Sequence, residues 1–113
     1  MHELSIAISI VDIAIRQANA SLATSVSCVE LDIGTISGIE YESLQFALSV
    51  AVNETILEDT EFKINKIEAL MECNSCDNLF TPNGLNGKCP DCTGTDTTLI
   101  KGKELQIRSL LVE

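Results

Sequence analysis

The sequence predicts an α+β fold in which two helices pack on one face of a three-stranded mixed sheet, with a four-cysteine subdomain inserted before the last strand. Three observations lead to this prediction. Two segments carry the apolar period of amphipathic helices, and three segments alternate as strands do. A polar segment, 73–98, holds four of the five cysteines. The chain has 113 residues, 45% of them hydrophobic, which is one domain's length and enough for a core.

The first predicted helix spans residues 4–22. Its apolar residues recur every three or four positions, whereas Ser9, Asp12 and Arg16 lie on the opposite side. Additional isoleucines widen the apolar arc, so we expect this helix to contact more than one surface. The same period returns over about 41–53, where we expect the second helix.

Three segments alternate between apolar and polar residues and predict strands with one buried face: 26–33, 62–72 and 104–112. The middle segment changes phase, because Phe62 and Ile64 share one parity and Ile67 and Ala69 share the other. We expect a single strand there, with a β-bulge near Asn65 and Lys66 that reconciles the two halves. The order helix, strand, helix, strand, insert, strand suits two helices on one face of the sheet.

The cysteine-rich segment contains two C-x-x-C pairs, separated by twelve residues: Cys73 and Cys76, then Cys89 and Cys92. Each pair places two sulfurs on one side of a tight turn, and two such turns complete a tetrahedron. Four thiolates select zinc or iron and leave no open coordination position, which is typical of structural Zn2+. We therefore expect a zinc-ribbon-like subdomain over 73–98 and a main domain formed by 1–72 and 99–113.

Two alternatives to zinc remain for these four cysteines. One is a pair of disulfides, and the other is a rubredoxin-like iron site. Glycine commonly follows the second cysteine of each pair in such iron sites, whereas Asp77 and Thr93 stand there in this chain. The fifth cysteine, Cys28, is expected to be a small strand residue, because a catalytic cysteine needs a nearby base and the only histidine is His2.

Charge and hydropathy exclude several classes of partner. Lys and Arg total 7 against 17 Asp and Glu, and the net charge of −10 repels nucleic acid. No apolar run reaches the roughly 18–20 residues that a membrane span requires. The N-terminus lacks the basic region of a signal peptide. We expect a cytoplasmic protein, whose thiols stay reduced.

The N-terminus carries a second metal-binding pattern. With Met1 retained, the α-amine of Met1 and the amide and imidazole of His2 form fused chelate rings, and Glu3 can supply a further amide or carboxylate. Three nitrogens in one plane suit Ni(II) or Cu(II). Because the positive end of the first helix disfavours a cation, we expect a labile, pH-sensitive site, which suits metal delivery better than storage or catalysis.

The opening Met1-His2-Glu3-Leu4-Ser5, followed by a helix and by two C-x-x-C pairs before a final strand, resembles the hydrogenase maturation nickel metallochaperones, the HypA/HybF family. Residues 33–40 and the segment Gly102-Lys103-Glu104-Leu105 are also similar to that family, so the resemblance covers essentially the whole chain.

The resemblance implies that His2 and neighbouring backbone nitrogens bind transported Ni2+, and that the four paired cysteines hold structural zinc. It implies a nickel-binding maturation GTPase and the [NiFe]-hydrogenase large subunit as partners, and urease maturation proteins for some relatives. Glu40 matches a position at which relatives often have an acid. The rival function is a zinc-stapled adaptor module without nickel delivery. An enzyme is not expected, because four cysteines leave zinc no position for a substrate.

Overall fold

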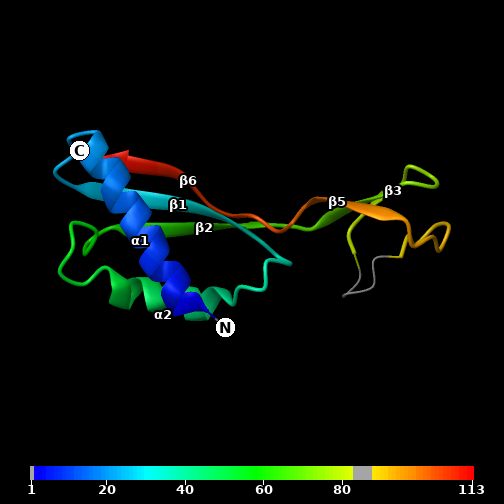
Figure 1. Cartoon of the computed structure of the whole chain (residues 1–113), viewed down its shortest axis with the longest axis horizontal. Coiled ribbons are helices and arrows are strands. Elements are labelled where there is room, and N and C mark those ends of the chain that lie inside the picture. Colours follow the sequence, from blue (N-terminus) through cyan, green and yellow to red (C-terminus); the bar gives the residue numbers. More distant parts are fainter. Residues whose placement is uncertain (1, 83–87) are drawn as a thin grey trace.

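The chain folds around two separate three-stranded sheets at opposite ends of an elongated molecule (Figure 1). The computed structural model describes residues 2–82 and 88–113, and its principal extents are 54 × 26 × 16 Å. The two helices and the first sheet occupy one end, and the cysteine-bearing segment with the second sheet occupies the other. Among the described helices, none combines the length and the apolarity needed to cross a bilayer.

The first sheet has the order β2-β1-β6. β2 runs parallel to the central strand β1 and β6 runs antiparallel to it, so the sheet is mixed. Its elements are α1 (Glu3–Ala20), β1 (Val26–Gly34), α2 (Tyr41–Ala51), β2 (Glu61–Ile67) and β6 (Leu105–Val112). The α+β prediction of two helices on a three-stranded mixed sheet is confirmed, and both helices begin and end within about two residues of the expected positions.

The core lies between the helices and one face of this sheet. Along β1, Val29, Leu31 and Ile33 are buried and form the helix-facing side. Small residues at the core positions of α1 let the helix approach the sheet and α2 closely: Ala7, Ala14 and Ala18. The opposite face of the sheet carries polar side chains such as Glu30 and Asp32, as the alternation of 26–33 predicts.

The expected single strand over 62–72 is wrong, because the chain leaves one sheet and enters another within it. β2 ends at Ile67, and β3 (Leu70–Cys73) is the central strand of a second sheet with β4 (Leu79–Phe80) and β5 (Thr97–Lys101). The change of phase therefore marks two different cores and not a bulge. Phe62 and Ile64 pack against the helices, whereas Met71 packs against a small cluster that contains Cys73 and Phe80.

Two short connections join the two sheets, one from β2 to β3 and one from β5 to β6, and the loop after β1 packs against both of them. We call this region the crossing. A Cβ atom on Gly34 would lie 1.9 Å from the carbonyl oxygen of Gly102, so these two backbones approach as closely as glycine allows. The Ile36 amide donates to the Gly102 carbonyl at 2.9 Å. The Ala69 amide donates to the Thr35 hydroxyl at 3.1 Å. The same loop leads into α2. This one segment therefore contacts the connection between β2 and β3, the connection between β5 and β6, and the helical end.

Candidate metal centres

The four paired cysteines come together at the end of the molecule that is remote from the helices. Their sulfur atoms all lie within 4.8 Å of one another. The Sγ atoms of Cys73 and Cys92 are 3.5 Å apart, and those of Cys76 and Cys89 are 3.6 Å apart. A disulfide requires about 2.05 Å, whereas a zinc tetrahedron with Zn–S bonds of about 2.3 Å places its sulfurs about 3.8 Å apart. The donor set and its spacing fit a structural zinc ion.

The two cysteine pairs adopt the same turn. In the first, the Asp77 amide donates to the Cys73 carbonyl at 2.8 Å; in the second, the Thr93 amide donates to the Cys89 carbonyl at 2.9 Å. Asp77 and Thr93 both have positive φ, 62° and 57°. This left-handed conformation explains why glycine is common at these positions, and it shows that the turn forms here without glycine.

The environment of the sulfurs distinguishes the four thiols. Hydrogen bonds from the backbone amides of Cys92 and Asp91 lower the pKa of Cys89 to about 6. The Asn78 amide favours the Cys76 thiolate, but a hydrogen bond from the Cys76 thiol to the Cys89 sulfur and desolvation outweigh it and raise the pKa of Cys76 to about 12. Thiolates packed this closely repel one another, so ionising all four requires a cation among them.

One sulfur of each pair is shielded from solvent. Cys73 is 0% exposed and Cys89 is 1% exposed, whereas Cys76 and Cys92 lie at the surface. The buried pair forms the small second core with Phe80 and Met71. Few apolar residues contribute to this core, so the stability of the second sheet depends on a bound metal ion more than the stability of the first sheet does.

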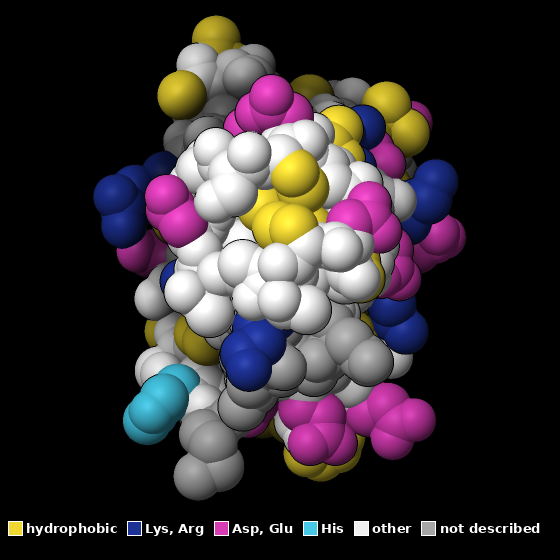
Figure 2. Space-filling model, turned by 90° about the vertical axis from the view of Figure 1, so that its right-hand side faces the viewer, with side chains coloured by type: hydrophobic (Ala, Val, Ile, Leu, Met, Phe, Trp, Pro, Cys, Tyr) yellow, Lys and Arg dark blue, Asp and Glu magenta, His cyan; other side chains and the backbone are white. Residues whose placement is uncertain are grey.

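The second candidate centre lies at the start of α1. His2 is exposed and precedes the helix, and its imidazole does not cap the first turn. Its carbonyl accepts hydrogen bonds from the Ile6 amide and the Ser5 hydroxyl, both at 3.0 Å. Figure 2, which views the molecule from the cysteine end, shows the only histidine projecting from the surface. Met1, the other expected nitrogen donor, lies outside the described residues.

Glu3 connects the start of α1 to the start of α2. The Glu40 backbone amide donates to the Glu3 carboxylate at 3.2 Å. The first turns of both helices therefore meet beside His2, and a carboxylate offsets the positive ends of their dipoles. The N-terminal pattern singled out Glu3 and the family resemblance singled out Glu40, but the contact between them spans 37 residues and has no local signal.

The two centres are separate in space. In Figure 1 the N-terminus lies below the helices, and the cysteine-bearing segment lies at the far end of the long axis. No residue of the described cysteine cluster comes from the N-terminal segment. The four-cysteine cluster and the start of α1 are therefore two distinct candidate centres that share no residue.

Cys28 belongs to neither centre, and it lies on the polar face of β1 with Glu30 and Asp32. On that face Asp32 is only 4% exposed and accepts hydrogen bonds from Arg108 at 3.0 Å and from Asn65 at 3.1 Å. The Arg108 guanidinium holds the pKa of Asp32 below its usual range. This ion pair joins β1 to β6 and is structural.

Comparisons with known proteins agree with this geometry. Residues 1–112 match the family described as hydrogenase/urease nickel incorporation metallochaperone, HypA. Hydrogenase maturation factor HypA of Chlorobium phaeobacteroides (strain BS1) is 38% identical over 113 residues, and that of Prosthecochloris aestuarii is 40% identical over 113 residues; both alignments cover 100% of each chain.

Solved structures also match over the whole length. The solution structure of the Ni metallochaperone HypA from Helicobacter pylori superposes with a TM-score of 0.71 at 25% identity, covering 99% of this chain and 97% of that one. A second solution structure of a HypA protein superposes with a TM-score of 0.74 at 25% identity, covering 100% of this chain and 97% of that one.

Proposed function

Because the chain belongs to the HypA family of hydrogenase/urease nickel incorporation metallochaperones, we propose that it binds Ni(II) at its N-terminus and delivers it, with a nickel-binding GTPase, to the [NiFe]-hydrogenase large subunit. The observation that carries the proposal is the position of His2. The only imidazole of the chain stands exposed at the first turn of α1, beside a carboxylate and ahead of the helical hydrogen bonds.

The proposed nickel ligands are the α-amine of Met1 and the amide and imidazole nitrogens of His2, with Glu3 as a further donor. The first four N–H groups of a helix have no intrahelical partner, so metal binding at the His2 and Glu3 amides breaks no helical hydrogen bond. The hydrogen bond from the Ile6 amide to the His2 carbonyl uses neither of these two N–H groups and holds the first turn of the helix. Nickel can therefore enter and leave without unfolding α1.

Zinc holds the other end of the protein together and takes no part in delivery. We assign its ligands as Cys73, Cys76, Cys89 and Cys92, whose sulfur atoms all lie within 4.8 Å of one another. Four thiolates fill the tetrahedron, so no zinc position is left for a substrate. The chain acts as a metal carrier and not as an enzyme, in the cytoplasm where its thiols stay reduced.

Two subdomains follow from this assignment: a nickel-binding unit of 1–72 and 99–113, and a zinc-binding unit of 73–98. Strands β3 and β5 of the second sheet extend to Leu70 and Lys101, a few residues beyond the zinc-binding unit on either side. These extensions form the joint between the units. The loop that closes the joint also leads to Glu40, beside the proposed nickel site.

An exposed apolar groove beside the N-terminus supports a docking site for the GTPase. The groove runs between α1 and α2 and is lined by Glu3, Leu4, Ser43, Phe46, Ala47 and Val50. Phe46 is 72% exposed, which is unusual for a side chain of that size. A partner docked there would lie next to His2, as close-range transfer of nickel requires.

Nickel titration by calorimetry tests the metal assignment. His2→Ala is expected to abolish specific Ni(II) binding while zinc content and the thermal unfolding curve stay unchanged, because the imidazole is exposed and does not cap α1. Unchanged nickel affinity in His2→Ala would instead favour the zinc-stapled adaptor. For docking, Phe46→Ser is expected to weaken association with the maturation GTPase at least fivefold. Leu22→Ser, at a residue 90% exposed beyond the far end of α1, is the matched control.

A further inference from the structure

The free side of β2 is the strongest unexplained feature of the fold. The order β2-β1-β6 leaves one long side of Glu61–Ile67 without a strand neighbour among residues 2–82 and 88–113. An edge strand presents a row of unpaired backbone N–H and C=O groups, which is a template for a further strand. Figure 1 shows β2 along the side of the sheet beneath which α2 runs.

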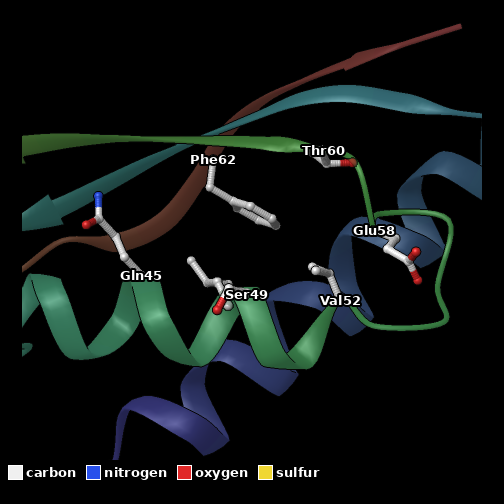
Figure 3. Close-up of a pocket in the computed structure, with 7 residues that line it drawn as sticks. Gln45, Ser49, Val52, Glu58, Thr60 and Phe62 are labelled. Carbon is white, nitrogen blue, oxygen red and sulfur yellow. The ribbon is translucent and has the colours of Figure 1, made fainter.

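A cavity opens beside this strand, between β2 and α2 (Figure 3). Its volume is about 320 Å³, at the low end of small-molecule sites and enough for one or two side chains. The Phe62 ring points from the strand toward the helix, and Leu48 and Val52 complete an apolar floor. Polar groups surround that floor: Gln45 and Ser49 on the helix, and Glu58 and Thr60 at the loop end.

The pleat of the sheet aligns the free side of β2 with the cavity. Phe62 pairs with the fully buried Val29 and so belongs to the helix-facing side of the sheet. Side chains alternate along a strand, so every second side chain of a strand added beside β2 would point toward the α2 layer. Backbone pairing and insertion of a side chain into the cavity are therefore compatible in one bound segment.

The charge around the cavity selects the kind of segment. Residues 54–61 contain Glu54, Glu58, Asp59 and Glu61 and no Lys or Arg. One Glu58 oxygen accepts a hydrogen bond from the Glu54 amide at 2.7 Å, while Asp59 and Glu61 are exposed. A basic segment complements this rim. A second copy of this chain, itself carrying a net charge of −10, is repelled.

We propose that the free side of β2 binds an extended segment of another protein as a fourth strand, with an apolar side chain in the cavity and an adjacent Lys or Arg facing the 54–61 rim. The interaction supplies a second attachment point, on a different side of α2 from the groove beside His2. It does not require nickel at the N-terminus, so its test is independent of the proposed nickel site.

Peptides selected from a random octapeptide library on the zinc-loaded, full-length chain provide the probe. The selected peptides are expected to combine an apolar residue with a neighbouring Lys or Arg. Ser49→Trp, which fills the cavity, should weaken their binding at least tenfold. Ser21→Trp makes the same change at an exposed residue that lines neither this cavity nor the groove beside His2, and should leave affinity within twofold. Selection of no peptide that is sensitive to Ser49→Trp would overturn the proposal.

N-methylated versions of the selected peptide test strand pairing itself. Methylating alternate backbone amides on one side of the peptide should abolish binding, whereas methylating the other set should have little effect, because only one side of a strand faces β2. Equal effects of the two sets would contradict strand addition. Glu61→Gln should weaken binding about threefold and reduce its salt dependence, which keeps the test valid if Ser49→Trp fails to fold. A dimer that Ser49→Trp dissociates would assign this edge to a second copy and overturn the proposal.

Discussion

Replacing Gly34 by Ala tests whether the crossing between the two sheets is rigid. The new Cβ would lie 1.9 Å from the Gly102 carbonyl oxygen and 2.5 Å from the Lys103 nitrogen, so backbone must move. The movement breaks the hydrogen bond from the Gly34 amide to the Glu104 carbonyl, 2.8 Å, and the one from the Ile36 amide to the Gly102 carbonyl, 2.9 Å. Two buried backbone bonds at about 1 kcal/mol each, with the strain of displacement, make a loss of about 3 kcal/mol.

That loss converts to a measurable shift in Tm. With an unfolding entropy of about 2.1 cal/mol/K per residue, a chain of 113 residues has about 0.24 kcal/mol/K, so Gly34→Ala should lower Tm by about 12 °C. The assay is calorimetric unfolding of the zinc-loaded protein, with zinc content measured on the same samples.

Gly38 supplies the matched control in the same loop. It has a φ of +83°, but a Cβ there meets nothing within 4 Å. Gly38→Ala should cost only the left-handed backbone strain of about 1 kcal/mol, or about 4 °C. A Tm loss for Gly34→Ala no larger than that for Gly38→Ala would refute the close-packed crossing.

Four further outcomes are expected. Cys89→Ala should lose zinc and unfold the second sheet while the helical end stays folded, and retention of one zinc per chain would exclude the four-thiolate site. Cys28→Ser should keep the stoichiometry of both metals in elemental analysis, because that residue lies on the polar face of the first sheet. A histidine-free extension before Met1 converts the α-amine to an amide and should weaken nickel binding strongly in calorimetry without altering zinc; equal affinity would remove the amine from the ligand set. Arg108→Met should raise the folded-state pKa of Asp32 toward its usual value. A carboxyl group whose pKa is lowered by folding stabilises the fold at pH values above its unfolded-state pKa, and this stabilisation is lost as the pH falls. Arg108→Met removes the stabilisation, so acid unfolding followed by circular dichroism should begin at a higher pH.

Local sequence patterns determined the first helix, the first strand and the two cysteine turns of this protein. The helical period of the first segment and the alternation of 26–33 depend only on neighbours in sequence, so both appear as expected in α1 and β1. The cysteine pairs are also local, because a C-x-x-C turn orients its own two sulfurs. Both pairs form the same turn, with Asp77 and Thr93 in the left-handed region.

The tertiary structure decided where the chain changes from one sheet to the other. The sequence pattern of 62–72 shows a change of phase but does not distinguish a bulge from a new strand partner. A strand takes its side-chain phase from the core that it covers. Phe62 covers the helical core and Met71 covers the small cysteine core, so the two halves belong to β2 and β3.

Contacts between distant segments were equally out of reach of sequence patterns. The bond between Glu3 and the Glu40 amide and the near contact of Gly34 with Gly102 each join segments more than thirty residues apart. The open side of β2 exists only because β1 takes the centre of the sheet and β6 returns to its other side. Chemistry carried by single residues, such as the His2 imidazole and the four thiols, can be recognised in the sequence, whereas the surfaces and joints around them arise from strand order and packing.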